Sequence, residues 1–308
     1  MMAAEYRKQV LAQQDQTTCP DGRPTYGTSR KLAPSEERST WIQGSHCWIK
    51  ASLPEESPCL LTGVCFLGDN IIVCDNENKT LKRFHIDGKF LEEMFLTDPC
   101  GICNMPNSTD IAITEPEIHQ ITRCSFDNAI TVDFSIKTEK QYQCIAALDD
   151  KYVVGCCDIA DPCIDFIDGN GTILKRMKSK NGEAKLFKNP ASIACLSSEK
   201  FLVSDPGICS LICASSTGDV RFRLETTGRP SSVCVDSSGA IFMAHYDQGV
   251  VYRLTGKGEV EGMVVNEKYG VSNPLSMCVS KGLMAITEET PSDRILLVKV
   301  ISLRMPRV

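Results

Sequence analysis

The sequence is poor in several features that would assign a protein to a class at once. It contains only four histidines and two tryptophans among 308 residues, and it has no run of 18 apolar residues. A run of that length is what a membrane-spanning helix requires, so no membrane partner is expected. Residues 1–16 are polar and charged and lack the apolar centre of a secretory signal. We therefore expect a cytoplasmic protein.

Recognisable catalytic and metal-binding motifs are also absent. None of the histidines stands in a motif with a Ser or Cys nucleophile and an Asp. Before residue 60 the only cysteines are Cys19, Cys47 and Cys59, which lack the paired spacing of a structural zinc site. The sequence therefore predicts a protein that is not an enzyme and has no cofactor and no metal ion.

Charge limits the expected partners. The chain has 33 Lys and Arg against 39 Asp and Glu, a net charge of −6. An acidic chain does not attract phosphates by its overall charge, so DNA is not expected as a partner and RNA is less favoured than protein.

The cysteine count is high, at seventeen. Most cysteines lie in apolar runs such as Ile72-Val73-Cys74, which favours buried, reduced thiols over disulfides. Cys100 and Cys103 form a C-x-x-C, and Cys156 and Cys157 are adjacent, so redox pairs are an alternative. The C-x-x-C opens an expected strand rather than a helix, and adjacent strand residues point to opposite faces, so core packing is favoured at both places.

A degenerate repeat of about forty residues runs from residue 61 to residue 303, which is typical of a β-propeller. Each of six copies opens with a small residue and an aliphatic residue. The openings are Gly63-Val64, Gly101-Ile102, Cys144-Ile145, Ser192-Ile193, Ser232-Val233 and Ser276-Met277. Short apolar runs and Gly- or Asn-containing turns follow each opening, so we expect an all-β fold with six four-stranded antiparallel blades.

The last repeat has only three strand-like segments before the chain ends. We expect residues 45–51 to supply its fourth strand and so to close the ring from the N-terminal side, which removes an open sheet edge. The predicted organisation is a flexible N-terminal segment, residues 1–44, with a short helix over residues 5–16, followed by the propeller, residues 45–308.

Residues 61–303 resemble the NHL-repeat propeller of tripartite-motif proteins. The resemblance rests on an apolar strand that ends in Asp, on Asn three residues later, and then on an alternating strand and a Gly turn. The first repeat carries it best, with Asp75, Asn78, Leu81, Phe84 and Gly88. It implies a substrate-recognition propeller that binds a protein. The RING and B-box that precede the propeller in that family are absent, so no ubiquitin-ligase activity is expected.

The loops between second and third strands all lie on one side of a propeller, and here they are rich in acid. They contain Asp75, Glu77, Glu115, Glu117, Asp158, Asp161, Asp205, Asp247, Glu288, Glu289 and Asp293. Turn chemistry alone selects Asp at such places. We nevertheless predict that these residues form an exposed acidic surface that binds a protein partner with basic segments.

Two other functions stay open. Some propellers of this family bind RNA, but the expected loop surface lacks the basic groups for it. Six-bladed hydrolases bind a metal near the starts of their inner strands. The six starting residues here do not form an oxygen-rich ligand set, which disfavours that function.

Overall fold

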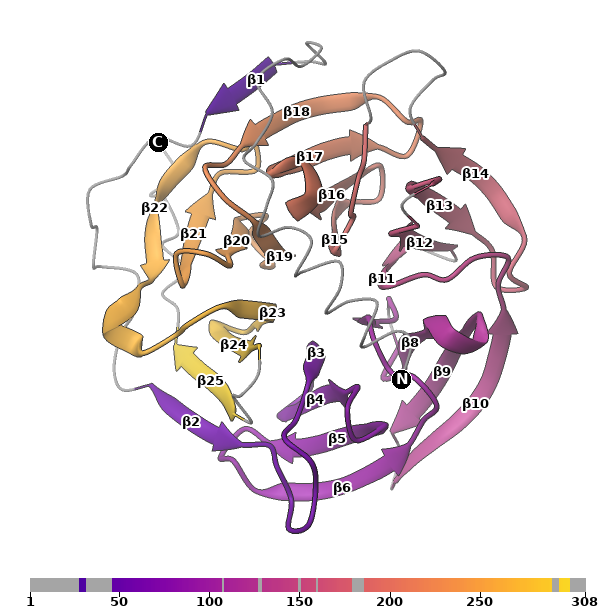
Figure 1. Cartoon of the computed structure of the whole chain (residues 1–308), viewed down its shortest axis with the longest axis vertical. Coiled ribbons are helices and arrows are strands. Elements are labelled where there is room, and N and C mark those ends of the chain that lie inside the picture. The colour runs from indigo at the N-terminus through magenta and orange to yellow at the C-terminus, as the bar shows by residue number, and fades with distance from the viewer. Residues whose placement is uncertain are drawn as a thin grey trace.

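The computed structural model describes residues 28–31, 46–106, 108–126, 129–148, 151–158, 160–178, 186–289 and 294–299. They form six four-stranded antiparallel sheets arranged as blades around a central axis (Figure 1). The predicted all-β six-bladed propeller is therefore confirmed. The predicted helix over residues 5–16 lies outside the described residues. Within the described ranges, no helix is long and apolar enough to cross a membrane.

The first three blades contain twelve strands, listed from the axis outward. The first blade is β3 (Leu61–Leu67), β4 (Asn70–Asp75), β5 (Thr80–His85) and β6 (Phe90–Phe95). The second is β7 (Ile102–Asn104), β8 (Ile111–Glu115), β9 (Gln120–Phe126) and β10 (Ile130–Lys137). The third is β11 (Cys144–Leu148), β12 (Lys151–Cys156), β13 (Cys163–Ile167) and β14 (Ile173–Met177).

The other three blades repeat this order. The fourth is β15 (Ser192–Ser197), β16 (Lys200–Asp205), β17 (Ser210–Ser215) and β18 (Val220–Glu225). The fifth is β19 (Pro230–Val235), β20 (Ile241–His245), β21 (Val250–Leu254) and β22 (Val260–Val265). The sixth is β23 (Pro274–Ser280), β24 (Leu283–Glu288), β25 (Arg294–Lys299) and β2 (Cys47–Lys50).

Strand β2 closes the ring as predicted from the three-strand count. It pairs antiparallel with β25, so Ile49 lies opposite Ile295, and both side chains are buried. The ring of Trp48 lies 3.9 Å from the guanidinium carbon of Arg294. The N-terminal strand thus completes the outer edge of the last blade.

A further strand extends the fourth blade. Strand β1 (Thr28–Lys31) pairs in parallel with β18, which places Lys31 opposite Glu225 (Figure 1). It lies within the segment predicted to be a flexible linker. The outer edge of this blade is therefore covered by a short segment from another part of the chain.

The small residues that open each repeat lie where neighbouring inner strands approach each other. A Cβ atom on Gly63 would lie 2.7 Å from the carbonyl oxygen of Cys100, and one on Gly101 would lie 2.6 Å from that of Gln143. Most of the following aliphatic residues, among them Val64 and Ile145, are buried in the apolar layers between blades. The opening pattern of the repeat is therefore a packing requirement of the ring.

Candidate functional site

The loops between second and third strands share one side of the ring with the loops that connect blades. Four of the predicted site acids end a second strand and accept backbone N–H groups from the connecting loop before their own blade. The donor–acceptor distances are 3.0 Å from Leu60 to Asp75, 2.8 Å from Thr97 to Glu115, 2.8 Å from Lys188 to Asp205, and 2.6 Å from Ser272 to Glu288. These carboxylates fasten the loops to the blades, because buried backbone donors require acceptors.

The expectation that these four acids are exposed is wrong. Asp75 and Asp205 are fully buried, and Glu115 and Glu288 are 2% and 1% exposed. Their hydrogen-bonding capacity is used inside the fold. They are therefore not available to contact a partner.

Burial changes the pKa of Asp205. Removal from water raises the pKa of its carboxyl to about 6, although three backbone N–H groups, from Lys188, Asn189 and Gly207, favour the ionised form. The carboxyl group therefore titrates in the mildly acidic range.

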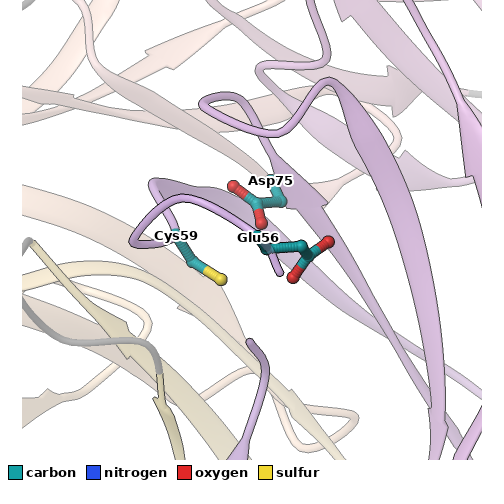
Figure 2. Close-up of side chains that lie close together, drawn as sticks. All are labelled: Glu56, Cys59 and Asp75. Carbon is teal, nitrogen blue, oxygen red and sulfur yellow. The ribbon is translucent and has the colours of Figure 1, made fainter. Parts of the chain in front are cut away.

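Asp75 belongs to a buried cage with Glu56 and Cys59, whose ligand atoms lie within 4.8 Å of one another (Figure 2). The geometry alone would suit a metal ion. The ammonium of Lys82 lies 2.8 Å from Asp75 Oδ2, 2.6 Å from Glu56 Oε2 and 3.7 Å from Cys59 Sγ. It also donates to the carbonyl oxygen of Ala51, at 3.1 Å. The chain's own cation therefore occupies the position that a metal ion would take.

The other predicted acids are more accessible, but two of them pair with cations. Glu77, Asp158 and Asp247 are exposed, and Glu117, Asp161 and Glu289 are half-buried. Asp161 lies 2.6 Å from Lys140, and Asp247 lies 2.6 Å from Arg229. Asp293 lies outside the described residues.

The charge on this side of the ring is mixed rather than acidic. The sequence argument weighed the acids against the cations of their own loops only. The connecting loops lie on the same side and add further cations. Those in the two sets of loops and at the adjoining strand ends are Lys50, Lys79, Lys137, Lys140, Lys178, Lys188, Arg229, Lys268 and Arg294. The connecting loops also add acids, among them Glu55 and Glu139. We call this side of the ring the loop face.

The axis of the ring holds a cavity of ≈ 330 Å³ lined by the inner strands. Among the residues that line it, the only ionisable side chains are thiols, one from each blade. They are Cys65, Cys103, Cys144, Cys195, Cys234 and Cys278. Burial raises the pKa of Cys65, Cys103, Cys234 and Cys278 above the usual range for thiols, so these four are neutral at pH 7. No cysteine among the described residues forms a disulfide.

The outer rim carries a feature that sequence reasoning missed. All the exposed large hydrophobic side chains of the described residues lie on the outer strands of three successive blades. They are Leu91 and Phe95 on β6, Val132 and Phe134 on β10, and Leu174 on β14. We call the first four the rim patch. In the structure the five consecutive residues 131–135 are all exposed, although Val132 and Phe134 are apolar.

Interactions between and within blades hold the rim patch in place. The carboxylate of Glu92 on β6 accepts the N–H of Ile130 on β10, at 3.1 Å, so these strands are neighbours around the rim (Figure 1). The ring of Phe134 lies 5.6 Å from the guanidinium of Arg123, which Asp110 fixes at 2.5 Å. Phe134 is thus an exposed aromatic side chain on a rigid support, as is typical of binding anchors.

Comparison with known proteins gives a weak sequence relationship. No protein-family model matches the chain. It is 23% identical over 225 residues to the E3 ubiquitin-protein ligase TRIM56 of Mus musculus, a match that covers 70% of this chain and 29% of that protein. The chain thus spans about a third of the length of the curated relative it matches. The resemblance to tripartite-motif proteins is supported to this extent, and NHL-repeat membership is not shown.

Solved structures share the fold at low sequence identity. The virginiamycin B lyase of Staphylococcus aureus has a TM-score of 0.61 at 11% identity, and the match covers 83% of this chain and 100% of the lyase. A gluconolactonase of Xanthomonas campestris has a TM-score of 0.61 at 13% identity over 79% of this chain and 86% of its own. A chain of a nidogen/laminin complex has a TM-score of 0.56 at 15% identity over 72% and 85%.

These comparisons correct one expectation. The prediction that the chain is not an enzyme is contradicted, because structures with a similar six-bladed ring include a lyase and gluconolactonases. The missing nucleophile motif did not justify that conclusion, since catalytic groups of a propeller converge in space from separate blades. At these identities the likeness establishes the fold.

Proposed function

We propose that this chain is a protein-interaction domain whose partner binds the rim patch. The observation that carries the proposal is the concentration of exposed apolar side chains on β6 and β10. Exposed apolar side chains that gather on neighbouring outer strands are candidates for interaction sites in soluble proteins. The similarity to part of a ubiquitin ligase and the fold likeness to a chain of a protein–protein complex support the same function.

The edge of β10 suggests how the partner binds. Strand β10 has eight residues, and its outer edge pairs with no other described strand. An exposed edge can accept an extended segment as an added strand. The fourth blade already accepts such a segment, because β1 lies against the edge of β18.

The chemistry of the partner follows from the side chains of the patch. Phe95 and Phe134 require apolar contacts, whereas the exposed Glu93 and Asp133 lie on the same two strands. We infer an extended segment of a protein in which apolar and basic residues alternate.

The accessible acids of the loop face remain a second proposed surface, for a basic partner. These are Glu77, Glu117, Asp158, Asp161, Asp247 and Glu289. This surface is a weaker candidate than the rim patch, because Asp161 pairs with Lys140 and Asp247 pairs with Arg229.

Differential capture from a cell extract separates the two surfaces. One variant carries Phe95→Ser and Phe134→Ser on the rim, and the other carries Glu77→Lys and Asp158→Lys on the loop face. Leu174→Ser is the matched control, because Leu174 is a 51%-exposed apolar residue on the outer strand of the next blade. The rim variant should lose at least about nine tenths of a bound protein, which corresponds to about 1.4 kcal/mol.

Three other outcomes decide against this proposal. Loss in the loop-face variant alone would move the site to that face. Equal loss in the Leu174→Ser control would mean that the effect is not local to the patch. Loss of capture on ribonuclease treatment of the unmodified protein would support the RNA-binding alternative.

A second candidate function is catalysis in the axial cavity, which the fold likeness to enzymes favours. The cavity offers thiol and hydroxyl groups, among them Cys278 and Ser276, rather than carboxylates. Hydrolysis or elimination assays on lactones and cyclic esters test it. Turnover that persists in a Cys278→Ala variant would place the reaction on other groups.

A further inference from the structure

The third blade brings two cysteines into direct opposition. Cys156 ends β12, Cys163 begins β13, and the two are partners in the antiparallel register. Directly opposed residues have Cα atoms about 4.5–5.5 Å apart, which is within the range that a disulfide spans. The described strand registers pair no other two cysteines.

The two thiols are hydrogen-bonded to each other and lie beside a cation. The ammonium of Lys140 is 3.6 Å from Cys163 Sγ and 2.6 Å from Asp161 Oδ2. The Cys163 thiol donates to Cys156 and so lowers the pKa of Cys156, with help from the N–H of Asp158 and the charge of Lys140. The same hydrogen bond and burial raise the pKa of Cys163. The first proton of the pair is therefore lost more readily than that of an isolated thiol, and the second less readily.

We propose that Cys156 and Cys163 are a peroxide-responsive pair that closes to a cross-strand disulfide. The Cys156 thiolate attacks one oxygen of hydrogen peroxide, breaks the O–O bond and becomes a sulfenic acid, and the leaving hydroxide takes a proton to form water. The Cys163 sulfur then attacks the Cys156 sulfur and displaces the sulfenic hydroxyl, which leaves as a second water with the proton of the Cys163 thiol. Two thiols and one peroxide thus give one disulfide and two waters.

The position of the pair allows this chemistry in spite of its burial. Cys156 is 2% exposed and Cys163 is fully buried, but both stand at the loop end of their strands. The loop between the two cysteines contains the exposed Asp158. Hydrogen peroxide is small and uncharged, and a thiolate is the form that it oxidises.

The disulfide would change the loop face. The segment between the two cysteines carries Asp158 and Asp161, two of the accessible acids. The Cys163 sulfur that would enter the disulfide lies beside the ammonium of Lys140, which also holds Asp161. Oxidation should therefore alter the loop face and leave the rim patch unchanged.

Peptide mapping tests the proposal without any binding partner. The full chain is treated with hydrogen peroxide, alkylated under denaturing conditions and digested without reductant. We expect two of the seventeen cysteines to lose alkylation and the peptides of Cys156 and Cys163 to be joined. The Cys163→Ser variant should stop at a sulfenic acid on Cys156 that dimedone traps.

Cys157→Ser is the matched control, since Cys157 is adjacent and buried, and its thiol faces the carbonyl oxygen of Pro190 at 3.2 Å. This variant should form the same cross-link as the unmodified chain. A cross-link that needs Cys157 would overturn the proposal, as would a peroxide-treated wild-type chain in which Cys156 and Cys163 are alkylated as fully as Cys74. The wild-type mapping decides even where a variant does not fold.

Discussion

The loop face and the outer rim use their side chains in opposite ways. On the loop face, carboxylates that looked available in the sequence hold connecting loops, as Asp75 holds Leu60 and Glu288 holds Ser272. On the rim, Phe95 is 76% exposed and Phe134 is 43% exposed, with the guanidinium of Arg123 against its ring. Residues on which the fold depends are poor candidates for binding. The rim carries apolar side chains that are exposed and on which we expect the fold to depend little.

The same contrast applies to strand edges. The edge of β25 is covered by β2 and that of β18 by β1, whereas that of β10 is open. A long edge with exposed apolar residues favours association with another chain unless charge or a bulge protects it. The bulge between Val132 and Phe134 and the exposed Asp133 offer such protection on β10.

The largest expected effect comes from uncovering β25, a strand that β2 covers in the last blade. Deleting residues 1–52 removes β2 and uncovers β25 and the buried Ile295. We expect this truncated chain to aggregate. Deletion of residues 1–40 also removes the four-residue strand β1 but leaves β2 in place, and should give a monodisperse protein if β2 is the strand that matters. Size-exclusion chromatography with light scattering distinguishes the two. Equal behaviour of both truncations would contradict the closing role of β2.

Removing a carboxylate on which the fold depends should have the next largest effect. Asp75→Ala leaves the fully buried ammonium of Lys82 with Glu56 as its remaining carboxylate. We expect a loss of about 3–5 kcal/mol in the free energy of unfolding, because breaking a buried pair leaves an undercompensated charge. Glu77→Ala, two residues away and exposed, should change it by less than about 0.5 kcal/mol. Urea titration of both variants checks the contrast.

The pH dependence of stability should show the burial of Asp205. Its folded-state pKa of about 6 lies above the model value of 3.8, so the folded state binds more protons between these values. The contribution of Asp205 to stability therefore falls as pH rises from about 4 to 6, by on the order of 3 kcal/mol, and then levels off. The control is Asp205→Asn, whose stability should lack this slope. Urea midpoints at pH 4, 5, 6 and 7 give the comparison, and parallel curves would show that burial does not shift the pKa.

His245 should give a pH dependence of stability with the opposite sign. Burial lowers the pKa of its imidazole, and both ring nitrogens lack a hydrogen-bond partner. Its folded-state pKa is thus below the model value of 6.5, so stability is lost as pH falls through this region. His245→Phe should reduce the loss of urea midpoint between pH 7 and pH 5. A variant with an unchanged pH profile would show that His245 does not titrate on unfolding.

The sequence predicted the fold because the repeat encodes packing. Small residues such as Gly63 and Gly101 are required where inner strands meet, so the openings mark every blade. Because the last repeat has only three strand-like segments, a fourth strand was expected near the N-terminus, where β2 lies. These features are local or periodic, which makes them readable from one chain.

The site was less predictable, because burial is a property of the assembled ring. Asp75 and Glu77 look alike in sequence, yet one is buried and the other exposed, since only the first ends a strand beneath a connecting loop. The exposure of Phe134 could not be foreseen, because an apolar residue of an alternating strand is expected to face the core. Outer strands lie farthest from the axis of the ring, where neighbouring blades diverge and cover their faces less completely.

Substitution of Phe134 should give the smallest change in stability. Phe134 also allows the most direct test of whether the partner binds the rim. Phe134→Ser should alter the free energy of unfolding by no more than about 0.5 kcal/mol, since the side chain is already 43% exposed. A photo-crosslinking amino acid is then placed at position 134, and separately at positions 174 and 77. In cell extract, position 134 should cross-link one protein, and both control positions should give at most a small fraction of that yield. Cross-linking at position 77 with none at position 134 would contradict the central claim that the partner binds the rim.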